Sequence, residues 1–359
     1  MKPSHIYFFL LITISCNNYI KINNNSFNNE SYLEYQNKKI LINDSLVIPK
    51  NKTLTISGKS QIKFNKNGII INNGIFKVGE NSKKYSQYSI NNDTLINIKS
   101  VVFIGNKRGS FIINNSIISI YNSKFKNIKF ISHNGNLKFN NNNFNNSALE
   151  ITKGSIKTIN CFLTNNTKLK IIQSENAIFN NNYFYKNNDV FIIKNTKNIK
   201  FLNNIFEKNS KCIRLLDNIK NINIYNNLII ENKTFIQSNY FSKSIYILNN
   251  TFYKNELVMY INLKKISDEV IISKNNIFSD NKELFNLTNT NINNSYCLSD
   301  NFNLTGFYNL NSKEVFENKN TYDFDLLKNS PAVRFGTNNK NIGANLTKLY
   351  YYKYLKYIN

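Results

Sequence analysis

The feature that most constrains the fold is a short phrase that recurs along the middle of the chain. It reads Ile-Lys-Phe-Leu-Asn-Asn-Ile-Phe-Glu-Lys-Asn over residues 199–209, and variants of its Asn-Asn-x-Phe core lie on both sides. An internal repeat of this kind outranks other signals of fold. Put in register on the Asn two places before the aromatic or aliphatic residue, it marks Asn142, Asn160, Asn182, Asn204, Asn227, Asn250 and Asn276, and Ser123 and Asp300 extend the series.

The spacing of this series indicates the architecture. The steps from Asn142 to Asn276 are 18, 22, 22, 23, 23 and 26 residues. A period near 22 is too short for a helical hairpin repeat or a propeller blade. It fits one coil of a parallel β-solenoid, which advances about 4.8 Å along the axis. The sequence therefore predicts an all-β chain that forms a single right-handed parallel β-helix of about 22-residue coils, with capped ends.

The residue types support these coils. Ile-x-Ile and Phe-x-Ile alternation gives short strands with one buried face. The Asn of each phrase falls at a turn, where it tolerates left-handed backbone angles, and stacked Asn amides can hydrogen-bond from coil to coil as a ladder. One residue per coil is expected to stack in the interior: Phe144, Phe162, Phe184, Phe206, Ile229, Phe252 and Phe278.

Composition excludes some classes of protein. About a fifth of the 359 residues are Asn, but hydrophobic residues make up 41%, so the chain is no disordered Asn-rich tract. The net charge is +25, and only three of the 46 basic residues are Arg. This excess of Lys is either the imprint of an A+T-rich genome or an affinity for a polyanion such as an acidic polysaccharide. The usual nucleic-acid-binding motifs are absent, so we expect no nucleic-acid partner.

Residues for metal or nucleophilic chemistry are scarce. The only His residues are His5 and His133, which argues against a histidine metal site or a Ser-His pair. No two of the four Cys residues have a metal-site spacing, and no disulfide is implied. The acidic residues form no readable cluster for Ca²⁺. We therefore expect no metal and no cofactor.

The N-terminus indicates export. Residues 1–15 combine Lys2 with the short apolar run 6–14, which is typical of a signal peptide and too short to span a bilayer. Thr-Ile-Ser-Cys at residues 13–16 resembles a bacterial lipobox, which implies that Cys16 is lipidated and anchors a cell-envelope protein. An ordinary cleaved signal of a secreted protein is the alternative. The polar residues 16–33 are expected to form a flexible tether.

The two ends of the repeat region resemble a known family. The motifs Leu46-Val-Ile-Pro49, Thr53-Leu-Thr-Ile-Ser-Gly58 and Gly74-Ile-Phe-Lys-Val-Gly79 resemble the opening of secreted, pectin-lyase-like right-handed parallel β-helix proteins of bacteria. Asp323-Phe-Asp-Leu-Leu-Lys-Asn-Ser-Pro-Ala-Val-Arg-Phe-Gly336, followed by Asn341-Ile-Gly-Ala344, resembles their closing segment. The resemblance implies one β-helix over residues 34–344. It implies no single activity, because such proteins include polysaccharide lyases and binding modules.

The last residues, 345–359, form a cationic and aromatic tail. It is expected to pack as a final strand or helix on the C-terminal edge, with contact to a membrane surface as the alternative. The protein is expected to be a monomer.

One face offers candidate site residues. In each coil the strand after the Phe turn should direct alternate residues outward: Lys168 and Lys170, then Val190, Ile192 and Lys194, then Cys212, Arg214 and Leu216, then Phe235 and Gln237. The polar members Lys168, Lys170, Lys194, Arg214 and Gln237 are the candidate binding residues. In lyases of this fold a Lys removes a proton next to a uronate carboxylate and an Arg neutralises that carboxylate, a role open to Lys170, Lys194 and Arg214.

Two functions follow. The first is a non-catalytic cell-envelope protein that binds carbohydrate or another surface polyanion. The second is a polysaccharide lyase acting on an acidic, uronate-containing glycan. A clustered triad of an acid, a Lys and an Arg in a deep groove would favour the lyase, and a flat, evenly lysine-studded face would favour binding.

Overall fold

The chain forms one long β-solenoid, seen in a computed structural model. The structure describes residues 19–49, 51–57, 61–64, 69–72, 75–79, 89–90, 93–99, 102–104, 110–114, 116–240, 244–264 and 270–352. The predicted signal peptide and Cys16 lie outside these residues.

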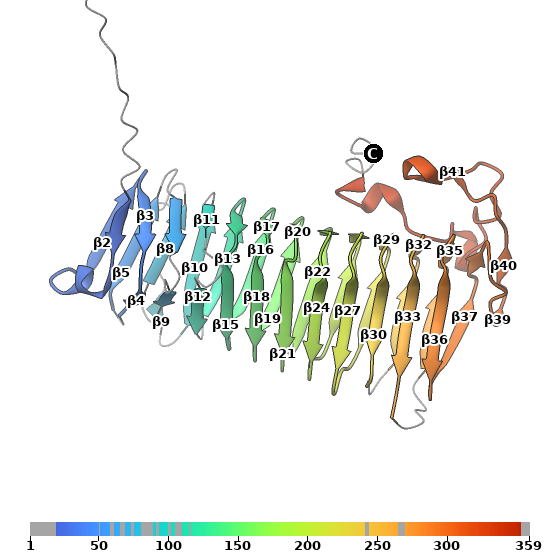
Figure 1. Cartoon of the computed structure of the whole chain (residues 1–359), viewed down its shortest axis with the longest axis horizontal. Coiled ribbons are helices and arrows are strands. Elements are labelled where there is room, and N and C mark those ends of the chain that lie inside the picture. Colours follow the sequence, from blue (N-terminus) through green and yellow to red (C-terminus); the bar gives the residue numbers. More distant parts are fainter. Residues whose placement is uncertain are drawn as a thin grey trace, which may run out of the picture.

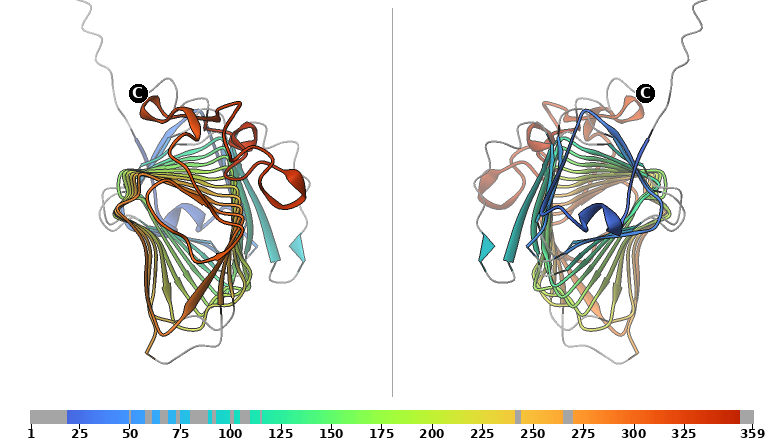
Figure 2. Two further views of the ribbon diagram at one scale, coloured as in Figure 1. Left: turned by 90° about the vertical axis from the view of Figure 1, so that its right-hand side faces the viewer. Right: turned by 90° about the vertical axis from the view of Figure 1, so that its left-hand side faces the viewer.

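Three parallel sheets, A, B and C, run along the solenoid. Each coil passes through B, then A, then C. Seen from the C-terminal end, this path turns counterclockwise while the chain approaches the viewer, so the winding is right-handed (Figures 1 and 2). The predicted fold is therefore confirmed.

Sheet A has the shortest strands, because a tight turn bounds it on each side. Its strands are β1 (Ile20–Ile22), β3 (Lys39–Ile42), β6 (Gln61–Phe64), β11 (Val102–Ile104), β14 (Lys124–Lys126), β17 (Asn143–Asn145), β20 (Phe162–Thr164), β23 (Tyr183–Tyr185), β26 (Ile205–Glu207), β29 (Leu228–Ile230), β32 (Thr251–Tyr253), β35 (Ile277–Ser279), β38 (Leu298–Ser299) and β40 (Leu310–Asn311).

Sheet B precedes sheet A in each coil. Its strands are β2 (Tyr32–Gln36), β5 (Thr53–Ser57), β8 (Ile75–Gly79), β10 (Asp93–Lys99), β13 (Ser116–Tyr121), β16 (Asn136–Asn140), β19 (Ser155–Ile159), β22 (Asn176–Asn180), β25 (Ile199–Leu202), β28 (Ile222–Tyr225), β31 (Ile245–Leu248), β34 (Val270–Lys274), β37 (Asn291–Ser295) and β39 (Gly306–Phe307), and β9 (Ser89–Ile90) pairs antiparallel with β10.

Sheet C follows sheet A and holds the predicted candidate residues. Its strands are β4 (Ser45–Ile48), β7 (Ile69–Asn72), β12 (Ser110–Asn114), β15 (Lys129–His133), β18 (Ala148–Thr152), β21 (Lys168–Ile172), β24 (Asp189–Lys194), β27 (Lys211–Leu216), β30 (Thr234–Ser238), β33 (Leu257–Asn262) and β36 (Glu283–Thr288).

The turn between sheets B and A holds the predicted Asn ladder. The Asn182 Nδ2 donates to Asn204 Oδ1 at 3.0 Å, and the same bond continues through Asn227 and Asn250 to Asn276. A second ladder, on the turn between sheets A and C, joins Asn187, Asn209, Asn232, Asn255 and Asn281 in the same way. These buried amides are satisfied coil by coil, so each coil fixes the height of the next.

Two members of the predicted series are out of register. The pairing of β17 with β20 places Cys161 above Asn142 and Leu163 above Phe144. Asn160 therefore lies one position outside the ladder, and Phe162 points outward rather than into the core. The pairing of β35 with β38 likewise places Cys297, not Asp300, above Asn276. The other predicted interior residues are buried.

Asn160 belongs instead to an outer column. In each of these coils the residue directly before the ladder position has a left-handed backbone, with φ of 51° at Asn160 and 56° at Asn226. Asn adopts this conformation at lower cost than other residues that have a Cβ. The first Asn of each pair thus forms the turn, and the second forms the ladder.

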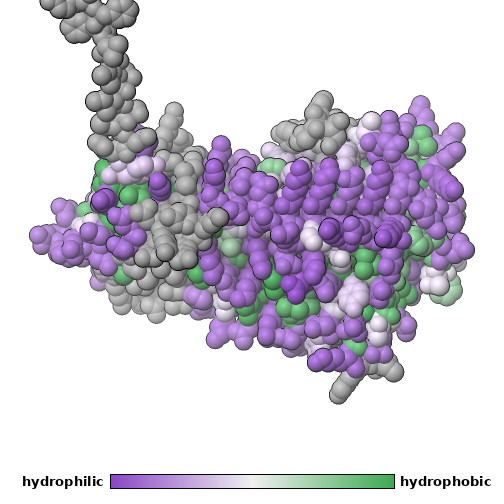
Figure 3. Space-filling model, viewed as in Figure 1, coloured by the Kyte–Doolittle hydropathy of each residue, from purple (hydrophilic) through white to green (hydrophobic). Residues whose placement is uncertain are grey.

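Hydrophilic side chains line much of the face in view (Figure 3).

The predicted start of the β-helix at residue 34 is too late. Strand β1 already pairs in parallel with β3, Ile20 opposite Ile40. The short 3-10 helix η1 (Asn24–Phe27) follows it and buries Phe27. Ordered structure therefore occupies residues 20–27 of the segment for which the sequence predicts a tether, because Ile22 and Phe27 reach the hydrophobic core.

The C-terminal segment does not pack on the last coil alone. Residues 312–352, here called the strap, return along the outside of sheet A toward the middle of the solenoid (Figures 1 and 2). The strap contains β41 (Phe316–Asn318), η3 (Lys319–Thr321), β42 (Asp323–Leu326), η4 (Thr337–Asn339) and η5 (Leu346–Lys348).

The strap is held by a second hydrophobic cluster. Its Phe324, Ile342 and Leu349 are buried with Ile205, Leu228 and other outward residues of sheet A. The expectation that residues 345–359 pack on the C-terminal edge is therefore wrong for the part described, 345–352. Residues 353–359 lie outside the described residues.

Candidate functional site

The predicted site residues on sheet C fall into separate columns. Strand pairing aligns Glu150, Lys170, Ile192, Arg214 and Gln237 in one outward column. Lys194 lies in another, between Ile172 and Leu216. Lys168 lies in a third, opposite Ala148. Because two coil steps separate Lys170 from Arg214, their backbones are about 10 Å apart.

Most of these cations are already paired. Lys170 and Lys129 each place their Nζ 2.9 Å from Glu150. Burial alone would raise the pKa of Glu150, but the hydrogen bonds from Lys170 and Lys129 lower it below its usual value. Lys194 pairs with Asp217 at 2.8 Å and Arg214 with Asp189 at 3.5 Å. Lys170, Lys194 and Arg214 therefore each have an acidic partner, and Lys170 shares its partner with Lys129.

Three residues expected to point outward are in the core. Val190, Cys212 and Phe235 are fully buried, and the Phe235 ring packs edge-on against Phe206 at 5.3 Å. The second and third residues of these strands are both buried, as at Cys212 and Ile213, so the alternation fails at this point. The Nε of Arg214 and the Oε1 of Gln237 are also buried, and neither has a hydrogen-bond partner among the described residues. These two atoms are closed to a ligand, although 30% of the Arg214 side chain is exposed.

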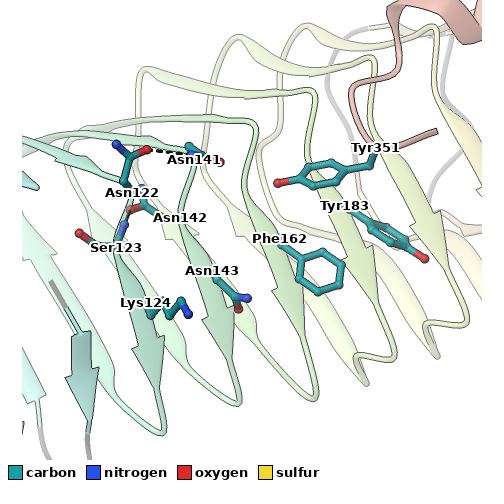
Figure 4. Close-up of a pocket in the computed structure, with 9 residues that line it drawn as sticks. All are labelled: Asn122, Ser123, Lys124, Asn141, Asn142, Asn143, Phe162, Tyr183 and Tyr351. Atoms are coloured by element: carbon teal, nitrogen blue, oxygen red, sulfur yellow. Dashed lines mark hydrogen bonds between the residues drawn. The ribbon is translucent and has the colours of Figure 1, made fainter. Parts of the chain in front are cut away.

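A pocket on sheet A is the stronger candidate site. It has a volume of about 460 Å³ and opens on the outer face of sheet A where the strap ends. We call it the strap-end pocket (Figure 4). It is lined by Asn122, Ser123, Lys124, Asn141, Asn142, Asn143, Phe162, Tyr183 and Tyr351.

Three aromatic rings form one wall. Phe162 and Tyr183 project from β20 and β23, and Tyr351 comes from the strap. The ring centres of Phe162 and Tyr183 are 5.0 Å apart, and Tyr351 lies 6.0 Å from Phe162 and 5.9 Å from Tyr183. These rings give the pocket a mainly apolar wall. Phe162 and Tyr183 neighbour each other only because the coils stack, and Tyr351 comes from the strap, 189 positions after Phe162.

The two tyrosine hydroxyls are turned to the protein. Tyr351 donates to the carbonyl of Asn160 at 2.7 Å, which fastens the strap end to the turn before β20. Tyr183 donates to the carboxylate of Glu207, which is buried and also pairs with Lys208 at 3.1 Å. Burial and the adjacent Glu207 carboxylate both raise the pKa of Tyr183 above its usual value. Tyr183 thus keeps its proton and presents a ring face.

The opposite side of the pocket is polar. Asn122, Asn141 and Asn143 are exposed at the rim, and Asn141 donates to Asn122 at 2.8 Å. Lys124 is also exposed, and it is the one charged residue of the lining. Amide groups beside an apolar wall can bind hydroxyl groups, and a single Lys can pair with one anionic group.

Sequence reasoning missed this pocket. Phe162 was assigned to the core because Asn160-Cys161-Phe162 mimics the Asn-x-Phe phrase of the other coils. The available signal was Leu163-Thr164, which restores the alternation if Cys161 takes the ladder position. Tyr351 lies in a run of three Tyr residues whose position on the solenoid no repeat specifies.

Two other kinds of site were sought in the structure. Within the described parts of the chain, no group of three or more His, Cys, Asp or Glu side chains is placed to hold a metal ion. No helix among the described residues is long and apolar enough to cross a membrane.

Comparison with known proteins gave structural likenesses only. No family model and no curated protein matches the chain. The periplasmic alginate epimerase AlgG superposes with a TM-score of 0.40 at 13% identity, over 82% of this chain and 83% of the enzyme. PfbA, a surface adhesin of Streptococcus pneumoniae, gives 0.33 at 13% identity over 77% and 81%. An exopolygalacturonase from Thermotoga maritima gives 0.30 at 13% identity over 79% and 82%. At such TM-scores nothing about activity follows from these likenesses.

Proposed function

We propose that this protein is a non-catalytic cell-envelope protein that binds an acidic carbohydrate in the strap-end pocket. The observation that carries the proposal is the pairing of an aromatic wall with a rim of Asn amides and one Lys in the same pocket. A sugar ring has a face of C–H bonds and an edge of hydroxyl groups. The electron-rich face of an aromatic ring attracts the C–H face, and amides hydrogen-bond with hydroxyls.

The size and charge of the pocket fit this class of ligand. A volume of about 460 Å³ lies within the usual range of small-molecule sites. The lining contains Lys124 and no carboxylate. A uronate or sulfated sugar could place its anionic group at Lys124, and the net charge of +25 would attract such a chain from a distance.

The alternative of a polysaccharide lyase has less support. Proton abstraction next to a uronate needs a base and a cation that neutralises the carboxylate, both at one sugar. Lys170 and Arg214 lie in coils two steps apart, and each pairs with an acid. Tyr183, the lining residue closest in type to a phenolic base, donates its proton to Glu207 and has a raised pKa. These contacts favour binding over cleavage.

Export and anchoring at Cys16 are part of the proposal. They rest on the N-terminal residues 1–16 alone.

The test uses purified protein with alginate, chondroitin sulfate and polygalacturonate. Wild-type protein should bind at least one of them, more weakly as salt rises because the attraction is partly ionic. Lys124→Ala should weaken binding about tenfold, the effect of losing one ion pair with an anionic sugar. Lys157→Ala is the matched control, because Lys157 is exposed on sheet B, outside the pocket.

The same mixtures test the lyase. Absorbance from unsaturated uronates should stay at background. Equal affinity of the Lys124→Ala and Lys157→Ala variants would refute the pocket assignment. A product signal that Arg214→Ala abolishes would establish the lyase instead.

A further inference from the structure

The outer turn column changes its residue type at the C-terminal end of the solenoid. The residue with the left-handed backbone before each ladder position is Asn in eight successive coils, from Asn122 to Asn275. In the last two coils it is Tyr296, with φ of 52°, and Tyr308, with φ of 54°. The pairing of β35, β38 and β40 puts both Tyr residues in the same column as Asn275.

This replacement is energetically unfavourable for the backbone. Asn is enriched in left-handed conformations, whereas a bulky side chain there is uncommon and costs of order 1 kcal/mol or more. The chain uses the tolerant residue in eight coils and departs from it twice in a row. Because residues held in such conformations cluster at functional sites, the departure points to a role for the rings.

The two rings form an exposed platform. The rings of Tyr296 and Tyr308 stack, with centres 5.0 Å apart and an angle of 23° between planes. Tyr296 also packs against Phe335, with ring centres 6.1 Å apart, and the Nζ of Lys274 lies 5.5 Å from the Tyr296 ring centre. Tyr308 is 69% exposed, and the adjacent Phe307 is 70% exposed. The inner ring is therefore fixed, and the outer one presents its free face to solvent.

The size of the platform restricts the partner. Specific protein interfaces bury about 800 Å² on each side, far more than two side chains offer. One sugar ring, by contrast, matches the face of one aromatic ring. The nearby Lys274 adds positive charge, which suits the acidic chain already proposed as the ligand.

We propose that Tyr308, supported by Tyr296 and flanked by Phe307, is a second carbohydrate contact that stacks on a sugar ring of the same chain that enters the strap-end pocket. The choice of an acidic glycan as the ligand rests on the proposed function, whereas the location of the site rests on the stacking and exposure of the rings. Asn122 and Asn141 of the pocket belong to the same turn column as Tyr308. Eight coil steps separate Asn142 from Asn309, so the two sites are about 38 Å apart along the axis. The strap, which bonds to Asn226 and Asn275 of the same column, lies between them, so a bound chain would pass beside it.

Two linked contacts change how chain length affects affinity. A long glycan can occupy both sites, and the second contact then forms at a high effective concentration. An oligosaccharide too short to span about 38 Å can occupy only one at a time. The platform should therefore matter for long chains more than for short ones.

The decisive variant is Tyr308→Asn, which restores the residue of the other coils. It should unfold at the same temperature as the wild type or higher, because it relieves a strained backbone. Its affinity for the long chain that the wild type binds should fall about threefold to tenfold, which is the effect expected from the loss of one stacking contact. Its affinity for a tetrasaccharide of the same glycan should not change. Tyr308→Phe keeps the ring and should bind as the wild type does.

The outcomes separate this inference from the proposed function. If Lys124→Ala has no effect while Tyr308→Asn weakens binding, the platform stands and the pocket assignment fails. If Tyr308→Asn binds long chains as the wild type does, the platform proposal is overturned. Loss of self-association in sedimentation with unchanged glycan binding would also overturn it, in favour of a contact between protein molecules.

Discussion

In most coils a pair of adjacent Asn residues performs two tasks, one for each Asn. The first Asn takes the left-handed turn, and the second donates its amide to the coil next to it, as at Asn203 and Asn204. Asn suits both tasks, because its short side chain carries a carbonyl and an amide. An Asn-rich chain can therefore be a rigid solenoid rather than a disordered tract.

The residues that face the core could be predicted in coils where Asn occupies both positions of the pair. At Asn160-Cys161 only the first position is Asn, and alignment on Asn shifted the register by one place. Such a shift reverses which residues face the core. It exchanged Phe162 and Leu163, and so it assigned one of the three aromatic residues of the pocket wall to the core. Coil pairing decides between the two registers, and within the coil itself only the alternation at Leu163-Thr164 indicates the correct one.

The core stack makes the clearest prediction for a single residue. Phe206 is fully buried between Phe184, whose ring stacks on it at 4.7 Å, and Ile229 of the next coil. Phe206→Ala should lower the free energy of unfolding by about 3–5 kcal/mol, because it removes buried apolar area and leaves a cavity that the fixed ladders cannot close. Denaturant unfolding measures this loss.

The matched control removes an aromatic ring from the surface. Tyr225 lies on sheet B and is 39% exposed, so Tyr225→Ala should cost far less. Equal losses for Tyr225→Ala and Phe206→Ala would contradict the stacked interior.

At the scale of elements, the strap links stability to the site. It covers the apolar outer residues of sheet A and ends with Tyr351, which forms part of the pocket wall. The closing motif in residues 323–344 could be identified from sequence, but its path could not. The strap has no period, and its contacts with Asn226 and Asn275 join residues 60 to 120 positions apart. The pocket was unpredictable for the same reason.

An ion pair holds the start of the strap. Lys319 of η3 places its Nζ 2.8 Å from Asp280 and 3.5 Å from Asp300, which is buried. Burial alone would lower the pKa of Lys319, but the hydrogen bond with Asp280 raises it above its usual value. A raised pKa means that this contribution is present at neutral pH and is lost only as the pH rises through the pKa of the folded state.

Lys319→Met should therefore loosen the strap at neutral pH, because it leaves the Asp300 carboxylate buried without a cation. We expect faster protease cleavage within residues 312–352 and weaker glycan binding, since Tyr351 loses its fixed place. Lys328→Met, at an exposed strap position, is the control. Cleavage of the Lys319→Met variant at the wild-type rate would show that the hydrophobic cluster alone holds the strap.

For the whole molecule, the charge is distributed rather than concentrated. Many of the Lys residues on sheet C pair with acids, so the net charge of +25 does not form a site there. It acts as a general attraction for polyanions, and the pocket and the platform add selectivity. This division explains why the candidate residues chosen as polar outward positions of sheet C, Lys168 to Gln237, differ from those that line the pocket.

The place of the whole molecule in the cell depends on Cys16. If Cys16 is lipidated, the protein should fractionate with membranes, and Cys16→Ser should release it into the soluble or secreted fraction.

The control is Cys161→Ser. Cys161 is buried, its pKa is raised to about 12 by burial, and it donates to the carbonyl of Ile159. Ser123 makes the equivalent bond two coils earlier, so Ser fits this position. Cys161→Ser should thus stay with the membrane. Membrane association of Cys16→Ser equal to that of the wild type would leave an ordinary cleaved signal and a secreted protein, whose retention at the cell surface would then depend on the glycan contacts alone.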